Sequence, residues 1–466
     1  MPSARSAKGH YAVAAAILLL TVVIVISAAT DAGAILPAIR TSAVAALLVV
    51  VWILLSQGDR RTVLNPALLL AAQAILLYSA LLWGSLWIGS PDWIRRVRID
   101  QLRGYLGSRS ELLVLGFGTL SLVVALASLH WSRSRATVDV SDGETQGRDY
   151  VPRLALLCAC AAAIFYAAEN FSAVVRSFAA AGPGRQLHDI AAPIIAFGLA
   201  VAVHSLARGN RLERVAVAAA IAFCTWAMMQ VMQAPVPVFM LLGLALLWLS
   251  VRPPTLRVAL AALACLVGAL GAVILVKTQI INERGLTLSH VTVGRTLVSK
   301  LIERQMESAG CLNHVVENQL SRGISADPFY FDIAVVPRAV WPDKPSLSRG
   351  AEFAQFHCGI RISANKNHSE TLTLLGEPIL EAGATGLVVA ELVILGIALL
   401  ALRAVFADTA LGPITVAALI PWIGTFQQHF ALYIANGTKM FLAMVPFILL
   451  VAFARRRRRR MSAARA

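Results

Sequence analysis

Charged residues are scarce in this sequence. They make up 14% of its 466 residues, whereas hydrophobic residues make up 58%, and the mean hydropathy is +0.72. A soluble protein of this length needs far more polar surface to cover its core, so the composition excludes a soluble globular fold. The apolar runs last roughly 17–23 residues, which is the length of membrane-spanning helices rather than of barrel strands. The sequence therefore predicts an all-α polytopic membrane protein.

Acidic residues are scarcer than basic ones. The chain has 25 Asp and Glu against 41 Lys and Arg, a net charge of +16 and a pI near 10.3. Such a balance can indicate nucleic-acid binding, but the arginines mostly lie in short connections between apolar runs. No stretch resembles a solvated basic groove with interleaved aromatic residues. We therefore interpret the charge as topogenic and expect no nucleic-acid partner.

The apolar runs predict about twelve membrane spans. The first, 11–29, is read as a retained helix; a cleaved signal peptide is the alternative, because ISAATDAGA supplies small residues after it. The predicted spans are 11–29, 37–55, 66–88, 111–130, 152–170, 189–206, 213–232, 236–251, 257–276, 383–402, 409–426 and 438–454. No internal repeat is visible in the sequence.

The basic connections predict the orientation of the chain. They fall on one side if the N-terminus is cytoplasmic, and include GDRR (58–61), SRSR (132–135) and RRRRRR (455–460). Because positive residues stay inside, both termini are expected in the cytoplasm and 277–373 outside, with the protein in the cytoplasmic (inner) membrane. The connection 92–109 departs from this rule, because it carries several arginines yet falls outside. It is either an amphipathic helix on the outer surface, with Trp93, Val97, Leu102 and Leu106 on its apolar face, or a topological exception.

This topology divides the chain into four parts. Residues 1–276 form an N-terminal bundle of about nine spans, and 277–382 form one large, partly helical extracytoplasmic loop. Residues 383–454 form the C-terminal spans. The basic tail 455–466 is expected to contact the anionic headgroups of membrane lipids.

Cysteine is also rare, with six residues in the chain. Four lie in predicted spans, where a thiol usually packs as a small apolar group: Cys158, Cys160, Cys224 and Cys265. Cys311 and Cys358 lie in the predicted extracytoplasmic loop, where an oxidising compartment permits a disulfide. Their spacing in the sequence does not say whether they meet, so the pair is either a disulfide or two thiols.

The polar interval 335–381 carries the candidate chemistry. Its cations suit a pyrophosphate, because arginine binds phosphate oxygens bidentately and lysine adds a compact charge. Its histidines and acids can supply a general base. The candidate pyrophosphate ligands are Arg338, Lys344, Arg349 and Arg361, and the candidate bases are His368, Glu377 and His357.

Each candidate also has a purely structural interpretation. The arginines can pair with Asp332, Asp343 or Glu352, and the histidines can be ordinary surface residues. Glu377 precedes a proline at an expected helix start, where an acid is favourable anyway. A short outer turn, QQHF (427–430), is predicted to place Gln427 and His429 where they line the same cavity as this interval. Glu391 lies within a span, where a carboxyl group is costly without a partner.

Two stretches resemble the Wzy-type O-antigen and oligosaccharide repeat-unit polymerases. VPRAVWPDKPS (336–346) is similar to their proline-arginine, W-P-x-K-P-like element, and TLTLLGEPILEAGATGLVV (371–389) is similar to their G-E…G-x-x-G passage. The many spans and one large outer loop are similar too. Motif-level resemblance covers about forty residues, and ILEAGATG departs from the tyrosine-asparagine-phenylalanine passage expected before the glycine pair.

The resemblance implies a metal-independent glycosyltransferase of C-type architecture, with no cofactor. It implies that a glycan linked to polyprenyl pyrophosphate is transferred onto another lipid-linked repeat unit, in a pathway with a flippase and a chain-length regulator. Arg338 and Lys344 match the proline-arginine and K-P elements, and Glu377 matches the G-E element. The first outer loop has a lone Asp31 and no carboxylate pair for a divalent ion.

Three other functions remain open on the sequence. An O-antigen ligase shares the donor chemistry and differs in its acceptor. A polysaccharide or lipid transporter can also have twelve spans, but typically shows internal repeats, interrupted helices and polar residues near the midplane. A non-catalytic assembly protein would use the outer loop only to dock a partner.

Overall fold

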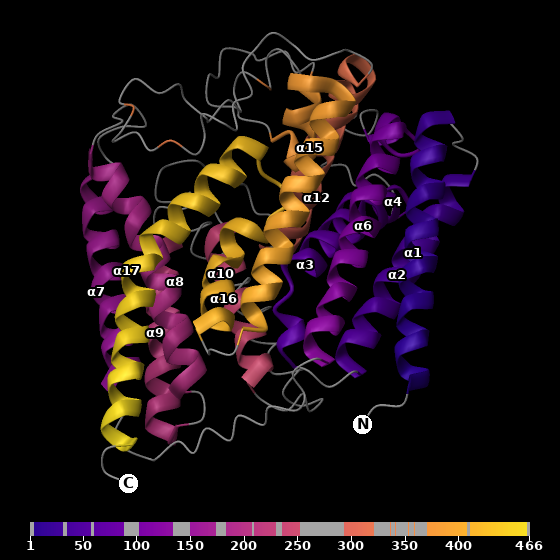
Figure 1. Ribbon diagram of the computed structural model, residues 1–466. Coiled ribbons are helices and arrows are strands. Elements are labelled where there is room, and N and C mark those ends of the chain that lie inside the picture. Colours follow the sequence, from indigo (N-terminus) through magenta and orange to yellow (C-terminus); the bar gives the residue numbers. More distant parts are fainter. Residues whose placement is uncertain are drawn as a thin grey trace.

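The structure is a computed structural model, and every regular element in its described residues is a helix (Figure 1). It describes residues 4–30, 35–56, 60–87, 102–133, 150–173, 183–206, 209–229, 235–251, 293–320, 336, 341, 353, 358, 371–407 and 411–463. In chain order the elements are α1 (Ala4–Thr30), α2 (Leu36–Ser56), η2 (Arg60–Val63), α3 (Pro66–Ala72), η3 (Gln73–Ala80), α4 (Leu81–Trp87), α6 (Arg109–Arg133), α7 (Tyr150–Ala173), α8 (Pro183–Leu206), α9 (Arg211–Met229), α10 (Pro235–Val251), α12 (Val293–Gln319), α15 (Thr373–Val405), α16 (Leu411–Ile423) and α17 (Phe430–Ala463).

The chain is an all-α membrane protein. Among the described residues, six helices are long and apolar enough to cross a membrane, and several others have shorter apolar stretches. Every predicted span coincides with a helix except 257–276, which lies outside the described residues. The number of twelve crossings stays a prediction, because several of these helices have apolar stretches shorter than a full span.

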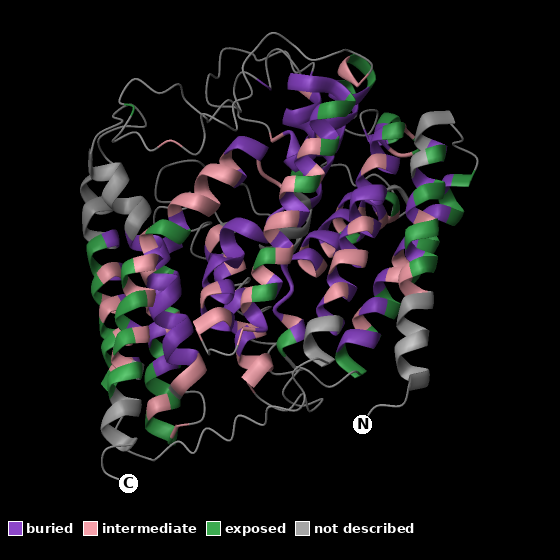
Figure 2. Ribbon diagram, viewed as in Figure 1, coloured by how far each residue is buried: buried purple, intermediate pink, exposed green. Residues whose placement is uncertain are grey.

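Large apolar side chains are exposed along the outer helices. On α7, Leu154 and Leu157 are each more than 60% exposed, and so are Leu449 and Phe453 on α17. Figure 2 shows the buried residues gathered on the sides of the helices that face into the bundle. Apolar side chains on the outside of a helical bundle are favourable where the surroundings are lipid. The surface therefore fits a bilayer.

A buried ion pair joins α2 to α6. The Arg40 guanidinium donates to both carboxylate oxygens of Glu111, at 2.8 and 2.9 Å, and lies 5.4 Å from the ring centre of Trp83. Glu111 also accepts from the hydroxyl of Ser79 and from the backbone N–H of Gly107. Both carboxylate oxygens are thus fully engaged, as a buried charge requires.

Different helices begin and end at the two ends of the bundle. Helix α1 begins and α17 ends at one end, while α15 begins at the opposite end (Figure 1). The α17 helix continues through the arginine run at 455–460 to Ala463, so the predicted tail begins as part of this helix. In the connection 92–109, the described residues Leu102 and Tyr105 are buried in the core and not spread on the outer surface; Trp93 and Val97 lie outside the described residues.

Candidate functional site

The candidate site is centred on the loop 424–429, which interrupts the path from α16 to α17. Helix α16 has 13 residues, or about 20 Å of helix, which is shorter than the ~30 Å hydrocarbon core of a bilayer. The loop is nevertheless enclosed: Phe426 is fully buried and His429 is 4% exposed. The sequence predicted a short turn here, and the structure shows that protein encloses this turn.

Gln73 holds this loop from the other half of the chain. Its side-chain nitrogen donates to the backbone oxygen of Gly424, and its side-chain oxygen accepts from the backbone N–H of Phe426 at 3.0 Å. Gln73 is the first residue of η3, a π-helical segment between α3 and α4. Irregular backbone is tolerated at membrane depth when protein groups satisfy it, and π-helical segments are frequent at functional sites.

The start of α15 packs against the same loop. The backbone N–H of Leu374 donates to the backbone oxygen of Phe426 at 3.2 Å. One residue earlier, Thr373 has a positive φ of 63°, which is an unfavourable conformation for a β-branched residue. The tertiary contact with the loop compensates for this local strain.

Glu377 lies on this first part of α15 and is 1% exposed. Its carboxylate accepts from the backbone N–H of Ala431 at 2.8 Å, in the first turn of α17. A helix N-terminus stabilises a negative charge in that position. Glu381, one turn further along, is 6% exposed. Two acidic side chains are therefore buried beside the loop.

A break in α15 separates this part from the membrane span that follows. Ala382 and Gly383 have non-helical backbone angles, and Gly383 has φ 57° and ψ −138°, which glycine adopts at least cost. Gly386 then packs so closely that a Cβ there would lie 2.0 Å from the backbone oxygen of Pro378. The break falls at the predicted boundary of residue 383, and it explains the glycine pair in GATG.

Polar side chains of α12 face the loop. The Gln305 side-chain nitrogen donates to Gln427 Oε1 at 3.2 Å, and Gln427 Nε2 donates to Ser308 Oγ at 3.2 Å. Ser308 Oγ lies 2.7 Å from Thr371 Oγ1, just before α15. These four side chains, Gln305, Gln427, Ser308 and Thr371, are called the glutamine network below. Next to it, Asn313 of α12 accepts from Ser110 at 2.8 Å and so reaches α6.

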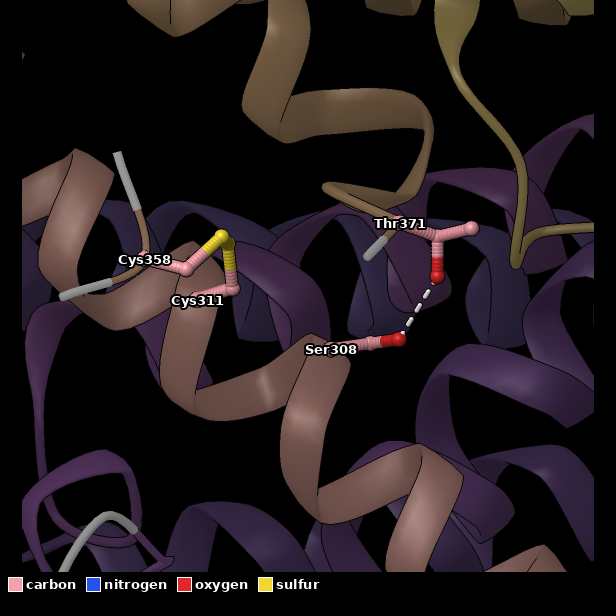
Figure 3. The surroundings of a disulfide bond; sticks show 4 residues. All are labelled: Ser308, Cys311, Cys358 and Thr371. Atoms are coloured by element: carbon pink, nitrogen blue, oxygen red, sulfur yellow. Dashed lines mark hydrogen bonds between the residues drawn. A yellow bond between two sulfur atoms is a disulfide. The ribbon is translucent and has the colours of Figure 1, made fainter. Parts of the chain in front are cut away.

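Two described points of the polar interval 335–381 attach beside this network. Cys358 forms a disulfide with Cys311 of α12 (Figure 3), which decides the question that the sequence left open. The Phe353 ring lies 4.8 Å from the His429 ring, between ring centres, and covers it. Together with Thr371, these contacts place Phe353 and Cys358 against α12 and the loop.

Among the predicted site residues, the structure describes Glu377 and, in the loop, Gln427 and His429. These come together around the start of α17 and the facing side of α12. Glu391 is half-buried in the later part of α15, away from this cluster in the chain. The other candidate ligands and bases lie outside the described residues: Arg338, Lys344, Arg349, Arg361, His357 and His368.

Two glutamines of the site were missed by sequence reasoning. Gln73 is the sole side-chain amide in the apolar stretch 66–88, and Gln305 stands among charged residues on the expected helix of the outer loop. A polar residue within a membrane span usually marks a functional or structural contact, so the sequence did contain an indication for Gln73. It contained no such indication for Gln305, because the burial of Gln305 follows from how α12 packs.

Comparison with known proteins gives no family: no family model, no curated protein and no solved structure matches this chain.

Proposed function

We propose that the protein polymerises polyprenyl-pyrophosphate-linked oligosaccharide repeat units into a surface polysaccharide at the outer face of the cytoplasmic membrane. One observation supports this most. Cys358 and Thr371, which lie in the same sequence interval as the candidate cations, contact α12 beside a buried polar site at the end of the bundle opposite the start of α1. The resemblance of 336–346 and 371–389 to repeat-unit polymerases agrees with that placement.

The proposed step is a glycosyl transfer. A hydroxyl oxygen of the acceptor repeat unit forms a bond to the anomeric carbon of the donor glycan. The bond from that carbon to the pyrophosphate oxygen breaks, and its electron pair leaves with the polyprenyl pyrophosphate. Arg338, Lys344, Arg349 and Arg361 are the cations proposed to stabilise this departing charge. The proton of the acceptor hydroxyl passes to a base.

The base is chosen from His368, His357 and Glu377. One carboxylate oxygen of Glu377 already accepts from the N-terminus of α17. That contact holds Glu377 in place and uses part of its acceptor capacity, so we favour a histidine as the base. Glu377 then acts as a positioning residue between α15 and α17.

A transporter is a second candidate, because the structure adds a feature that the sequence did not show. The interruption between α16 and α17, with buried polar side chains around it, is common in transporters. An O-antigen ligase remains an alternative that shares the donor chemistry. The three functions differ in the lipid-linked product that accumulates when the protein is lost.

A deletion strain scored for surface glycan separates these functions. Loss of a polymerase leaves single repeat units on their carrier and removes the ladder of longer chains. Loss of a ligase leaves long chains on the carrier, and loss of a transporter leaves units on the cytoplasmic side.

The substitution Arg338→Ala should reproduce the polymerase result at normal protein abundance. Arg103→Ala, which removes a charge at an exposed outer position, should keep the ladder. A full ladder with Arg338→Ala would contradict the site.

A further inference from the structure

The glutamine network has a fixed direction. The backbone oxygen of Arg304 can only accept, and it lies 3.4 Å from the side-chain amide of Gln427. The Gln427 atom on that side is therefore the nitrogen Nε2, and its oxygen Oε1 faces Gln305. Gln305 must then present its own nitrogen to Gln427, at the observed 3.2 Å. The bonds to Arg304 and Ser308 together favour these amide orientations.

This direction leaves the Gln305 side-chain oxygen as an acceptor. Gln305 is 2% exposed, and among the described residues its Oε1 has no hydrogen-bond partner. A buried polar atom left without a bond costs about 1–3 kcal/mol. The group that completes this site must donate a hydrogen, as a hydroxyl or an amide N–H does.

The other end of the network offers a donor. Ser308 Oγ accepts from Gln427 and shares a second hydrogen bond with Thr371 Oγ1 at 2.7 Å, in which either hydroxyl can donate. When Ser308 donates, the hydroxyl proton of Thr371 is available to an outside acceptor. An acceptor and a donor joined by one rigid network complement a ligand that is rich in hydroxyl groups.

Two other buried hydroxyls also have no hydrogen-bond partner within the described part of the chain, those of Tyr105 and Thr225. Tyr105 lies beside the closed Arg40–Glu111 ion pair, where burial and then the Glu111 charge raise its pKa well above the ordinary value. Thr225 stands on α9, which carries no part of the polar interval. Only Gln305 joins its unpaired atom to a network that reaches the interval with the candidate cations.

We infer that α12 and the loop 424–429 form a glycan subsite, in which Gln305 Oε1 accepts from a sugar hydroxyl or acetamido N–H. The inference rests on the proposed function and names where the oligosaccharide, as distinct from its lipid pyrophosphate, is held.

Binding of oligosaccharides to the purified full-length protein tests the subsite. The probe is the mixture released by partial acid hydrolysis of the producing organism's own surface polysaccharide, and the measurement is the Kd by titration calorimetry. Gln305→Leu removes one hydrogen bond, so its Kd should rise about tenfold. Asn318→Leu is the matched control, because the Asn318 side chain is exposed thirteen residues further along α12 and donates to the backbone oxygen of His314 in the same helix; its Kd should not change.

Equal Kd values for the wild type and Gln305→Leu would overturn the subsite and leave a water as the partner of Gln305. Absence of binding by the wild type would overturn it as well. Gln305→Met serves as a second apolar variant if the leucine variant does not fold. The deletion strain reports on the proposed function separately. A lost ladder with an unaffected Gln305→Leu rejects the subsite alone, whereas glycan binding with a normal ladder rejects the polymerase.

Discussion

Two buried polar networks lie in the bundle, and they differ in how completely their atoms are bonded. The Arg40–Glu111 network joins α2 to α6, and both Glu111 oxygens are bonded within it. The glutamine network reaches α12 through Gln305 and Ser308, and it keeps one buried acceptor unbonded among the described residues. The first network has the features of a structural clamp, and the second has the features of a ligand site.

The difference also follows the helices that each network uses. The Arg40–Glu111 network joins α2 to α6, and Ser79 of the π-helical segment η3 donates to the same carboxylate. The glutamine network lies where the chain is interrupted, between α16 and α17 and near the break in α15. Non-helical backbone in a membrane protein needs hydrogen-bond partners from the surrounding protein, and the loop 424–429 obtains two of them from Gln73.

The largest effect is expected for Arg40→Ala. Removing the cation leaves Glu111 as an uncompensated buried charge, which costs about 3–5 kcal/mol. The matched control is Arg153→Ala, because the Arg153–Glu213 pair is exposed and such pairs are worth about 0–1 kcal/mol. Thermal unfolding of the purified protein should show a large drop for the first variant and almost none for the second. An equal drop in unfolding temperature for the two variants would mean that the Arg40–Glu111 network does not stabilise the bundle more than an exposed ion pair does.

Next in size is the loss of the disulfide. Cys311 and Cys358 are 47 residues apart, and a bond that closes such a loop is worth about 2–4 kcal/mol. We expect the double substitution Cys311→Ser with Cys358→Ser to lower the unfolding temperature and to abolish glycan polymerisation. Reductant added to the wild type should reproduce both changes, while full activity under reduction would separate the disulfide from the site.

The break in α15 predicts a smaller effect. Gly383→Ala places a Cβ at a positive φ that costs about 1–3 kcal/mol, and Gly386→Ala brings a Cβ against the Pro378 backbone oxygen. Gly396→Ala is the control in the same helix, because nothing lies within 4 Å of a Cβ there, and alanine favours a helix by about 1 kcal/mol. Stability measured by denaturation should fall for the first two and hold or rise for the third.

The smallest effect on stability is expected for a substitution in the glutamine network. Gln305→Leu replaces an incompletely bonded amide with an apolar group of similar size, which changes stability by less than about 1 kcal/mol. Gln73→Leu, in contrast, removes both bonds that hold the loop backbone and should destabilise by about 1–3 kcal/mol. A Gln305→Leu variant as unstable as Gln73→Leu would show that Gln305 is structural.

The sequence predicted the membrane class well because span length and apolar composition follow directly from bilayer thickness. The glycine pair in GATG was singled out from resemblance, and the structure gives it a reason in backbone angle and close packing. A turn at QQHF was predicted from its polar residues, but its enclosure by protein was not. Its burial depends on the Gln73 bonds and on the packing of α12, which are long-range contacts that local patterns do not encode.

The most direct test of the account is polymerisation by the reconstituted full-length protein. Lipid-linked repeat units isolated from the deletion strain are supplied in proteoliposomes, and product length and initial rates are measured. We predict chains longer than one unit for the wild type and for Asn318→Leu, and for Gln305→Leu a KM raised about tenfold at unchanged kcat. Wild-type protein that leaves the single units unchanged would contradict the account.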